Sequence, residues 1–544
     1  QASPAFTHRV EPLPSATATA PASDLPSGEQ VSSAFLLLGK SMLGIAGAYL
    51  LRALAESSAL PRLVTAAVAI VYAIAWLVAA SRISARARFA GALYAGTSAL
   101  ILAPMLWELT MRFHVLAPVA SAVVLGLFVA AATALNWRRE SAPDFAVAYG
   151  AAALTALGLS IVTHEMIGFI LLLLAMLAIA EYRFMRNGGH GVRMLIAAVS
   201  DCAIWILIVV YRTAPDTRAD YPALGTAALA GPASLLFLLT TAAVVYWTAG
   251  LRRKITAFGT TQAVVAFLLW VLTALFLIPH FSAAMVGVIC LLFAGTCYAA
   301  AYALFRPTQE LHNFYVFSFW AAALLLGGVY LTLPPAWAIA SLALASIVSA
   351  VLAVRICCIT LECHGIIYLG VAAVACGLLE YSFDALAGNM PARVAWSIFL
   401  VSGCALLCYA AARERERERW QLQLLHLIPA LLAVCAIAAL TAHGALRLLA
   451  LRMNPAAFHV AFIRTLILCA IALALAFAGS RWRRLELKRI AYAALAFVAA
   501  KLVFEDLRHG HMGFIAASIF LFALTLIGVP RLARISSRAP VRQI

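Results

Sequence analysis

Apolar stretches of about 20 residues recur along this chain from Ser33 almost to its C-terminus. Wound as an α-helix, a stretch of that length matches the hydrocarbon thickness of a bilayer. The chain is 65% hydrophobic and only 11% charged, whereas soluble proteins average roughly 25% charged residues. We therefore predict an all-α, polytopic transmembrane helical bundle of about eighteen spans without a sizeable soluble domain. The predicted spans are residues 33–53, 62–81, 89–111, 115–136, 144–163, 166–182, 194–211, 230–250, 260–279, 283–305, 313–332, 336–355, 364–383, 392–411, 423–442, 458–479, 487–504 and 512–530.

Basic residues alternate between the loops that join these spans. The even-numbered loops and the C-terminal tail hold 26 Lys and Arg residues, and the odd-numbered loops hold 9. Cytoplasmic loops carry the excess of positive charge in membrane proteins. One missed or invented span would invert the alternation beyond it, so the pattern supports the span count and predicts that both termini are cytoplasmic.

The two ends of the chain differ in composition from the spans. Residues 1–32 contain five prolines among Ala, Ser and Thr, which cannot bury enough apolar surface to fold. We interpret them as a disordered linker or tail, preceding a multi-span domain at residues 33–530 and a basic cytoplasmic tail at residues 531–544. Because the chain begins with Gln1, it is expected to be processed or to be part of a longer protein.

The net charge of +17 does not indicate nucleic-acid binding, because the basic residues lie in short clusters between apolar stretches rather than on one face. The sequence contains no phosphate-binding loop, dinucleotide loop or nucleophile elbow, and these absences argue against an ATPase or a cofactor enzyme. Cys357 and Cys358 are adjacent, whereas zinc sites use separated ligand pairs. We expect no metal and no cofactor; the expected partners are membrane lipids and, as further candidates, other membrane proteins.

Both ends of the predicted bundle resemble one family. Residues 485–534 combine a basic entry, Lys501 within the helix, Asp506 at its far end and a final span with a basic tail. The first span is glycine-patterned, with Gly39, Gly44 and Gly47. These features resemble the bacterial "domain of unknown function 2339" family of many-helix membrane proteins. The resemblance implies a multi-pass protein of the bacterial plasma (inner) membrane and no particular activity; residues 90–480 match it only in composition.

Three of the ionisable residues within predicted spans form a candidate buried polar site: Lys40, Asp201 and Arg464. An ionisable group inside a membrane costs roughly 2.5–3.5 kcal/mol on insertion scales, so it is a functional candidate by default. Lys40 lies near the cytoplasmic surface, where it either extends its ammonium to the interface or makes an internal contact. Asp201 and Arg464 have no opposite charge within one helical turn. Each therefore needs a partner from another helix, either for structural pairing or for function.

A second candidate site lies at the outer end of span seventeen and consists of Lys501, Glu505, Asp506 and His509. Glu505 follows Lys501 by four residues, so the two side chains can pair on one helix face. The alternatives are an interfacial ion pair and a site for a polar head group or a proton relay.

Three functions fit this pattern. The first, slightly preferred, is a transporter or flippase-like protein for a lipid-linked or amphipathic substrate. The second is a membrane scaffold or assembly partner of an envelope or polysaccharide system. The third is an intramembrane acyl or glycosyl transferase. A transporter requires a polar region with interrupted helices, whereas dry, tightly paired charges would favour a scaffold.

The charge alternation predicts which loops can be labelled from each side of the membrane. Single cysteines near Arg253 and Arg483 should react only with reagents that reach the cytoplasm, because these loops are basic. Cysteines near Pro215 and Met453 should react from outside. Labelling of the Arg253 and Pro215 loops from the same side would show that the span count between them is wrong.

Overall fold

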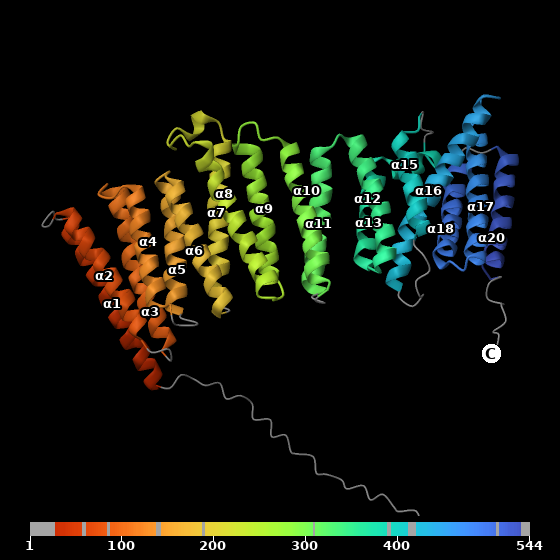
Figure 1. Ribbon diagram of the computed structural model, residues 1–544. Coiled ribbons are helices and arrows are strands. Elements are labelled where there is room, and N and C mark those ends of the chain that lie inside the picture. The colour runs from red at the N-terminus through yellow and green to blue at the C-terminus, as the bar shows by residue number, and fades with distance from the viewer. Residues whose placement is uncertain are drawn as a thin grey trace, which may run out of the picture. The chain divides into compact units, whose positions relative to one another are not determined.

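The computed structural model describes residues 28–56, 61–83, 87–137, 143–187, 191–307, 311–388, 393–411, 420–507 and 511–534, and these residues are helical apart from the short connections (Figure 1). They form two compact units, residues 1–245 with 257–278, and residues 246–256 with 279–544. The helices of unit 1 are α1 (Gly28–Glu56), α2 (Arg62–Arg82), α3 (Arg88–Trp107), η1 (Glu108–Arg112), α4 (Pro118–Leu135), α5 (Pro143–Val162), α6 (Met166–Asn187), α7 (Gly191–Arg212), η2 (Pro215–Arg218), α8 (Thr226–Val245) and α9 (Ala257–Leu277).

Unit 2 contains the remaining helices. They are η3 (Tyr246–Gly250), α10 (Ala283–Ala300), η4 (Ala301–Phe305), α11 (Leu311–Thr332), α12 (Pro335–Ile356), α13 (Ile359–Ala375), α14 (Leu378–Leu386), α15 (Trp396–Ala411), α16 (Trp420–Ala450), α17 (Ala457–Arg481), α18 (Leu485–Lys501), η5 (Leu502–Asp506) and α20 (Met512–Arg534).

Each of the eighteen predicted spans coincides with a helical segment. Among the described residues, fourteen helices are long and apolar enough to cross a membrane, or fifteen if the bent pair α13–α14 is one span. The predicted spans outside the fourteen are those at α1, whose apolar part runs Leu36–Leu50, at α13–α14, at the 16-residue α15 and at α18. The all-α multi-span fold is thereby confirmed, and the count of eighteen stays a prediction.

The predicted ends of the multi-span domain differ slightly from the helices. Helix α1 begins at Gly28, five residues before the predicted start, and α20 continues to Arg534. Most of the predicted linker, residues 1–27, and of the tail, residues 535–544, lies outside the described residues.

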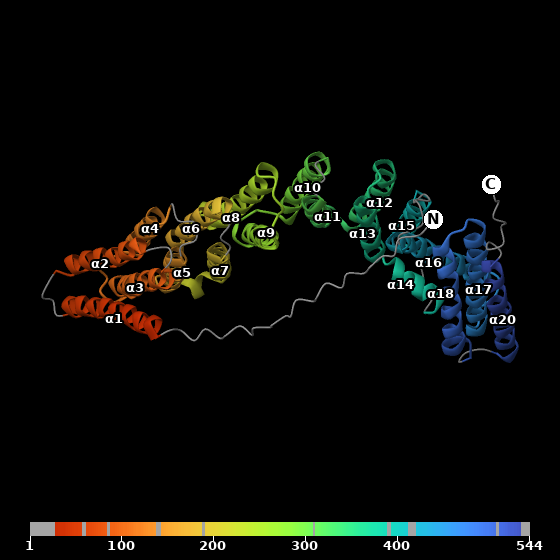
Figure 2. The same ribbon diagram turned by 90° about the horizontal axis from the view of Figure 1, so that it is seen from below.

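Unit 1 is a two-layer array. Odd-numbered helices α1, α3, α5, α7 and α9 pack side by side in one layer, and even-numbered helices α2, α4, α6 and α8 pack in the other (Figure 2). Helices make their contacts with neighbours one or two places along the chain, as in repeat proteins. Such an array leaves broad apolar faces exposed, with Leu100, Val119 and Leu127 each more than half exposed. Hydrocarbon is the solvent that those faces fit.

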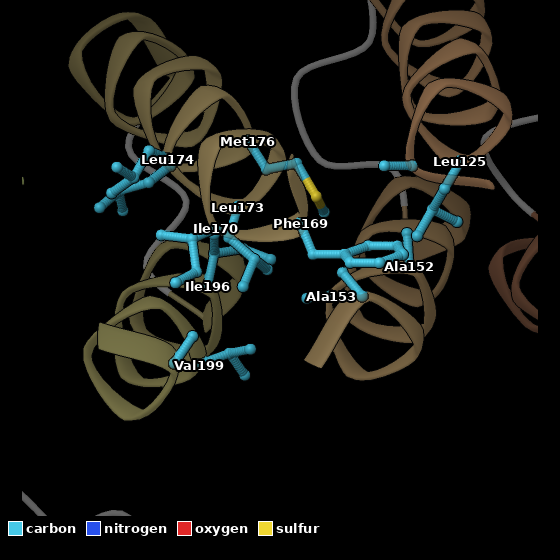
Figure 3. Packing of buried hydrophobic residues seen from close by; sticks show 14 of the residues in the cluster. Leu125, Ala152, Ala153, Phe169, Ile170, Leu173, Leu174, Met176, Ile196 and Val199 are labelled. Atoms are coloured by element: carbon cyan, nitrogen blue, oxygen red, sulfur yellow. The ribbon is translucent and has the colours of Figure 1, made fainter. Parts of the chain in front are cut away.

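Small residues let the helices of unit 1 approach closely. On α5, Ala148, Ala153 and Ala156 are fully buried, and Phe169 of α6 extends its ring against Ala152 and Ala153 (Figure 3). Lipid chains are as apolar as these side chains, so association in a membrane depends on such close packing rather than on removal from water.

Unit 2 uses glycines for the same purpose at the α10–α11 pair. A Cβ built on Gly287 would lie 2.9 Å from the carbonyl oxygen of Gly328, and still closer to Thr332 Oγ1. A Cβ on Gly328 would in turn lie 2.9 Å from the carbonyl oxygen of Gly287. The two backbones therefore touch at this crossing, and neither position has room for a side chain.

The close crossing predicts that glycine-to-alanine substitutions at two positions of α10 have different effects on stability. Gly287→Ala should destabilise the protein by about 1–3 kcal/mol, the usual cost of overpacking, and lower its melting temperature in detergent. Gly295→Ala is the matched control, because nothing lies within 4 Å of its added Cβ and alanine favours a helix over glycine by about 1 kcal/mol. Equal melting temperatures for both variants would contradict the close crossing.

Candidate functional site

Arg464 of predicted span sixteen and the charged residues at the outer end of predicted span seventeen form one ionic cluster. The cluster consists of Arg464 and Thr465 on α17, Lys501 at the end of α18, and Glu505 and Asp506 on η5. Two cations and two carboxylates balance one another. The Lys501, Asp506 and Arg464 side chains are each no more than 3% exposed, and Glu505 is the most open member at 19%.

Lys501 contacts both carboxylates because the α-helix is followed by a π-turn. Its Nζ lies 3.2 Å from Glu505 Oε2 and 2.6 Å from Asp506 Oδ1. In an α-helix the i+4 position faces residue i, and a π-turn adds the i+5 position. Residues 502–506 form a π-turn, so both acidic residues reach the ammonium. The predicted Lys501–Glu505 pair is present, and Asp506 is the closer partner.

The remaining donors of Lys501 bind α17. The ammonium donates to the backbone oxygen of Ala461 and to Thr465 Oγ1, each at 2.9 Å, and Thr465 Oγ1 donates to Asp506 Oδ2 at 2.9 Å. An ammonium has three protons, and here they are donated to Ala461, Thr465 and Asp506, with Glu505 as a further ionic contact. Lys501 is therefore fully engaged in joining α17 to α18.

Arg464 joins a third element to the cluster. Its Nη1 donates to Glu505 Oε1 at 2.8 Å, and its Nη2 donates to the carbonyl oxygens of Asp384 and Gly388 at 3.0 and 2.8 Å. Those carbonyls lie at the C-terminal end of α14, where backbone oxygens carry partial negative charge; the Asp384 oxygen also accepts the N–H of Gly388 at 3.2 Å. The guanidinium satisfies them, and its Nε atom is buried without a hydrogen-bond partner.

The element that Arg464 contacts is half of a broken helix. Helices α13 and α14 are bent by 60° at Cys376 and Gly377. Gly377 has φ = 71°, in the left-handed region that glycine adopts without a Cβ clash. The sequence-based prediction treated residues 364–383 as one continuous span, and the apolar residues at the break gave no sign of it.

The other predicted site residues lie elsewhere. Asp201, half-buried on α7, accepts a hydrogen bond from Gln262 Nε2 of α9 at 2.8 Å, so its observed partner is a neutral amide rather than a cation. Lys40 is exposed on α1. His509 lies outside the described residues. Arg464 and Asp201 therefore belong to separate environments in different units.

Several polar contacts were not expected from the sequence. Glu181 and Arg193 form a buried ion pair at 2.5 Å between α6 and α7, although Arg193 lies outside the predicted spans and Glu181 had not been singled out. His426 and Glu362 pair at 2.9 Å beside an enclosed cavity of about 20 Å³ between α13 and α16. A cavity of that size holds about one water molecule. In the described residues, no group of three or more His, Cys, Asp and Glu side chains is arranged to hold a metal ion.

These observations define the class of protein: the chain is a multi-pass integral membrane protein with fourteen or fifteen candidate spans in its described residues. No family model, curated protein or solved structure matches it. The resemblance to the "domain of unknown function 2339" family stays a prediction.

The closed contacts around Lys501 predict a large effect of removing one charge. Asp506→Asn leaves a buried ammonium with reduced compensation and should destabilise the protein by about 3 kcal/mol, measured by thermal unfolding in detergent. Glu380→Gln, an exposed carboxylate of α14, should have no measurable effect. The double variant Lys501→Met, Asp506→Leu should recover most of the loss; a double variant no more stable than Asp506→Asn would show that the pairing is not what stabilises this region.

Proposed function

We propose that this protein crosses the membrane about eighteen times with both termini in the cytoplasm, and that it moves or presents a lipid-linked or amphipathic substrate whose anionic head reaches Arg464 from the outer side. The observation that carries the proposal is the broken helix α13–α14, whose second half ends at backbone carbonyls that are bound by a charged residue inside a predicted span. Interrupted helices that present backbone ends to charged groups are typical of substrate sites in transporters.

The contacts of Arg464 allow an exchange of partners. Its bond to Glu505 is a side-chain contact to the most exposed member of the cluster, whereas its bonds to Asp384 and Gly388 are to backbone oxygens. An anionic head group can compete with the Glu505 carboxylate for Nη1, because a guanidinium binds carboxylate and phosphate in the same planar geometry. Lys501 would keep Glu505 neutralised during such an exchange.

A membrane scaffold is the second candidate, and the burial of Lys501 and Asp506 favours it. All the donors of Lys501 are used within the protein, and Arg464 is 3% exposed. Dry, paired charges of this kind fix which helices pack together. In this alternative the protein is an assembly partner in the bacterial plasma membrane, and Arg464 only anchors the end of α14.

A vesicle assay separates the two functions. The purified full chain, reconstituted into liposomes with a fluorescent phosphatidylglycerol or a fluorescent polyprenyl phosphate, should increase the fraction of probe that external dithionite bleaches. Arg464→Gln should reduce this increase at least tenfold, and Glu380→Gln should not. Glu505→Gln, which frees Nη1 while leaving Lys501 paired with Asp506, should retain movement of the probe.

The controls identify the outcome that contradicts transport. Each variant is compared at equal protein content and after its melting temperature has been measured, so that loss of fold is separated from loss of movement. If the wild-type protein moves neither probe faster than protein-free vesicles do, transport is wrong and the scaffold remains.

A further inference from the structure

Unit 1 has an apolar groove between α4 and α6 in its even-numbered layer. The groove has a volume of about 630 Å³ and is lined by Ala130, Thr133, Ala134, Leu135, Trp137 and Ile179. The hydroxyl of Thr133 is bonded to the Val129 carbonyl and to Tyr149 OH, and the indole N–H of Trp137 is the other polar side-chain group of the lining. The remaining lining side chains are aliphatic, so the walls fit a hydrocarbon chain.

The rim of the groove has the composition of a membrane–water interface. Trp137 stacks on Tyr182 with ring centroids 5.7 Å apart and planes 16° apart, and each residue is 47% exposed. Trp and Tyr gather at the level of lipid head groups because their rings are apolar and their edges are polar. The open end of the groove is therefore expected at head-group depth, on the side of the α4–α5 and α6–α7 loops that the charge pattern predicts to be cytoplasmic.

Positive charge lies at this rim. Arg186 is exposed, with its guanidinium 5.9 Å from the centre of the Tyr182 ring. The neighbouring Arg193 is neutralised by Glu181, and Arg183 is turned onto the Phe145 ring at 4.0 Å.

We propose that the groove binds one anionic phospholipid of the predicted cytoplasmic leaflet, with an acyl chain between α4 and α6 and the phosphate at Arg186. Apolar walls and an aromatic rim would accept any phospholipid, whereas the basic rim selects a negatively charged head group. The inference concerns unit 1 only and does not depend on the function proposed for the Arg464 cluster.

The test uses the full chain in detergent with phosphatidylglycerol that carries a photoreactive diazirine on an acyl chain. After illumination, mass spectrometry of peptides should place the label within residues 130–137 or 176–182. Unlabelled phosphatidylglycerol should compete for labelling at least fivefold more effectively than phosphatidylethanolamine. Arg186→Gln should reduce labelling about fivefold, the effect expected of one basic residue at an anionic surface, and Arg186→Lys should retain it.

Two tryptophan substitutions on α4 locate the acyl chain. Ala134→Trp fills the groove and should abolish labelling of these peptides. Val123→Trp is the matched control, since Val123 is 57% exposed on the same helix and lies outside the groove, and it should leave labelling unchanged. Equal competition by the two lipids, or wild-type labelling of Ala134→Trp at an unchanged melting temperature, would overturn the proposal.

Discussion

Inside a bilayer no water is present to satisfy the peptide backbone, and the arrangement of this protein follows from that constraint. The described residues meet it with helices throughout. Where α14 ends, backbone carbonyls lie at the limit of the regular helix, and Arg464 supplies donors to two of them, those of Asp384 and Gly388. The buried guanidinium of Arg464 needs a carboxylate to balance its charge, and Glu505 provides it. Glu505 also contacts Lys501, which pairs with Asp506. The ionic cluster thus connects the end of α14 with α17, α18 and η5.

The positions of the helices could be predicted from the sequence, because each span is an apolar stretch bounded by charged or turn-forming residues. The way in which the helices pack against one another could not be predicted. Spans that are apolar on all sides carry no periodic stripe to show which face meets a neighbour, so nothing in the sequence of α4 indicates that it packs on α6 as well as on α5. The 60° bend was also hidden, since Cys376 and Gly377 fit within an ordinary apolar span.

Only some of the contacts in the candidate site could be predicted from the sequence. Lys501 and Glu505 were paired correctly because their contact is local, but Arg464 contacts Glu505 across 41 positions, a separation at which a single sequence gives no pairing signal. Asp201 was expected to need a partner from another helix, and its amide partner Gln262 went unnoticed because uncharged polar residues are common in spans. Arg193 was overlooked because it was counted with a loop, and Glu181 because it lies at the end of the predicted span 166–182, although each is buried.

The π-turn at residues 502–506 contains one residue more than the α-helical turn that would replace it. Deleting one of residues 502–504 would let the chain wind as a regular helix, with the two carboxylates at the i+3 and i+4 positions, where both still face Lys501. Deleting Glu505 or Asp506 would instead remove a carboxylate and leave a positive charge of the cluster uncompensated. In this segment the position of a deletion, rather than the change of length, therefore decides its effect on the charge balance.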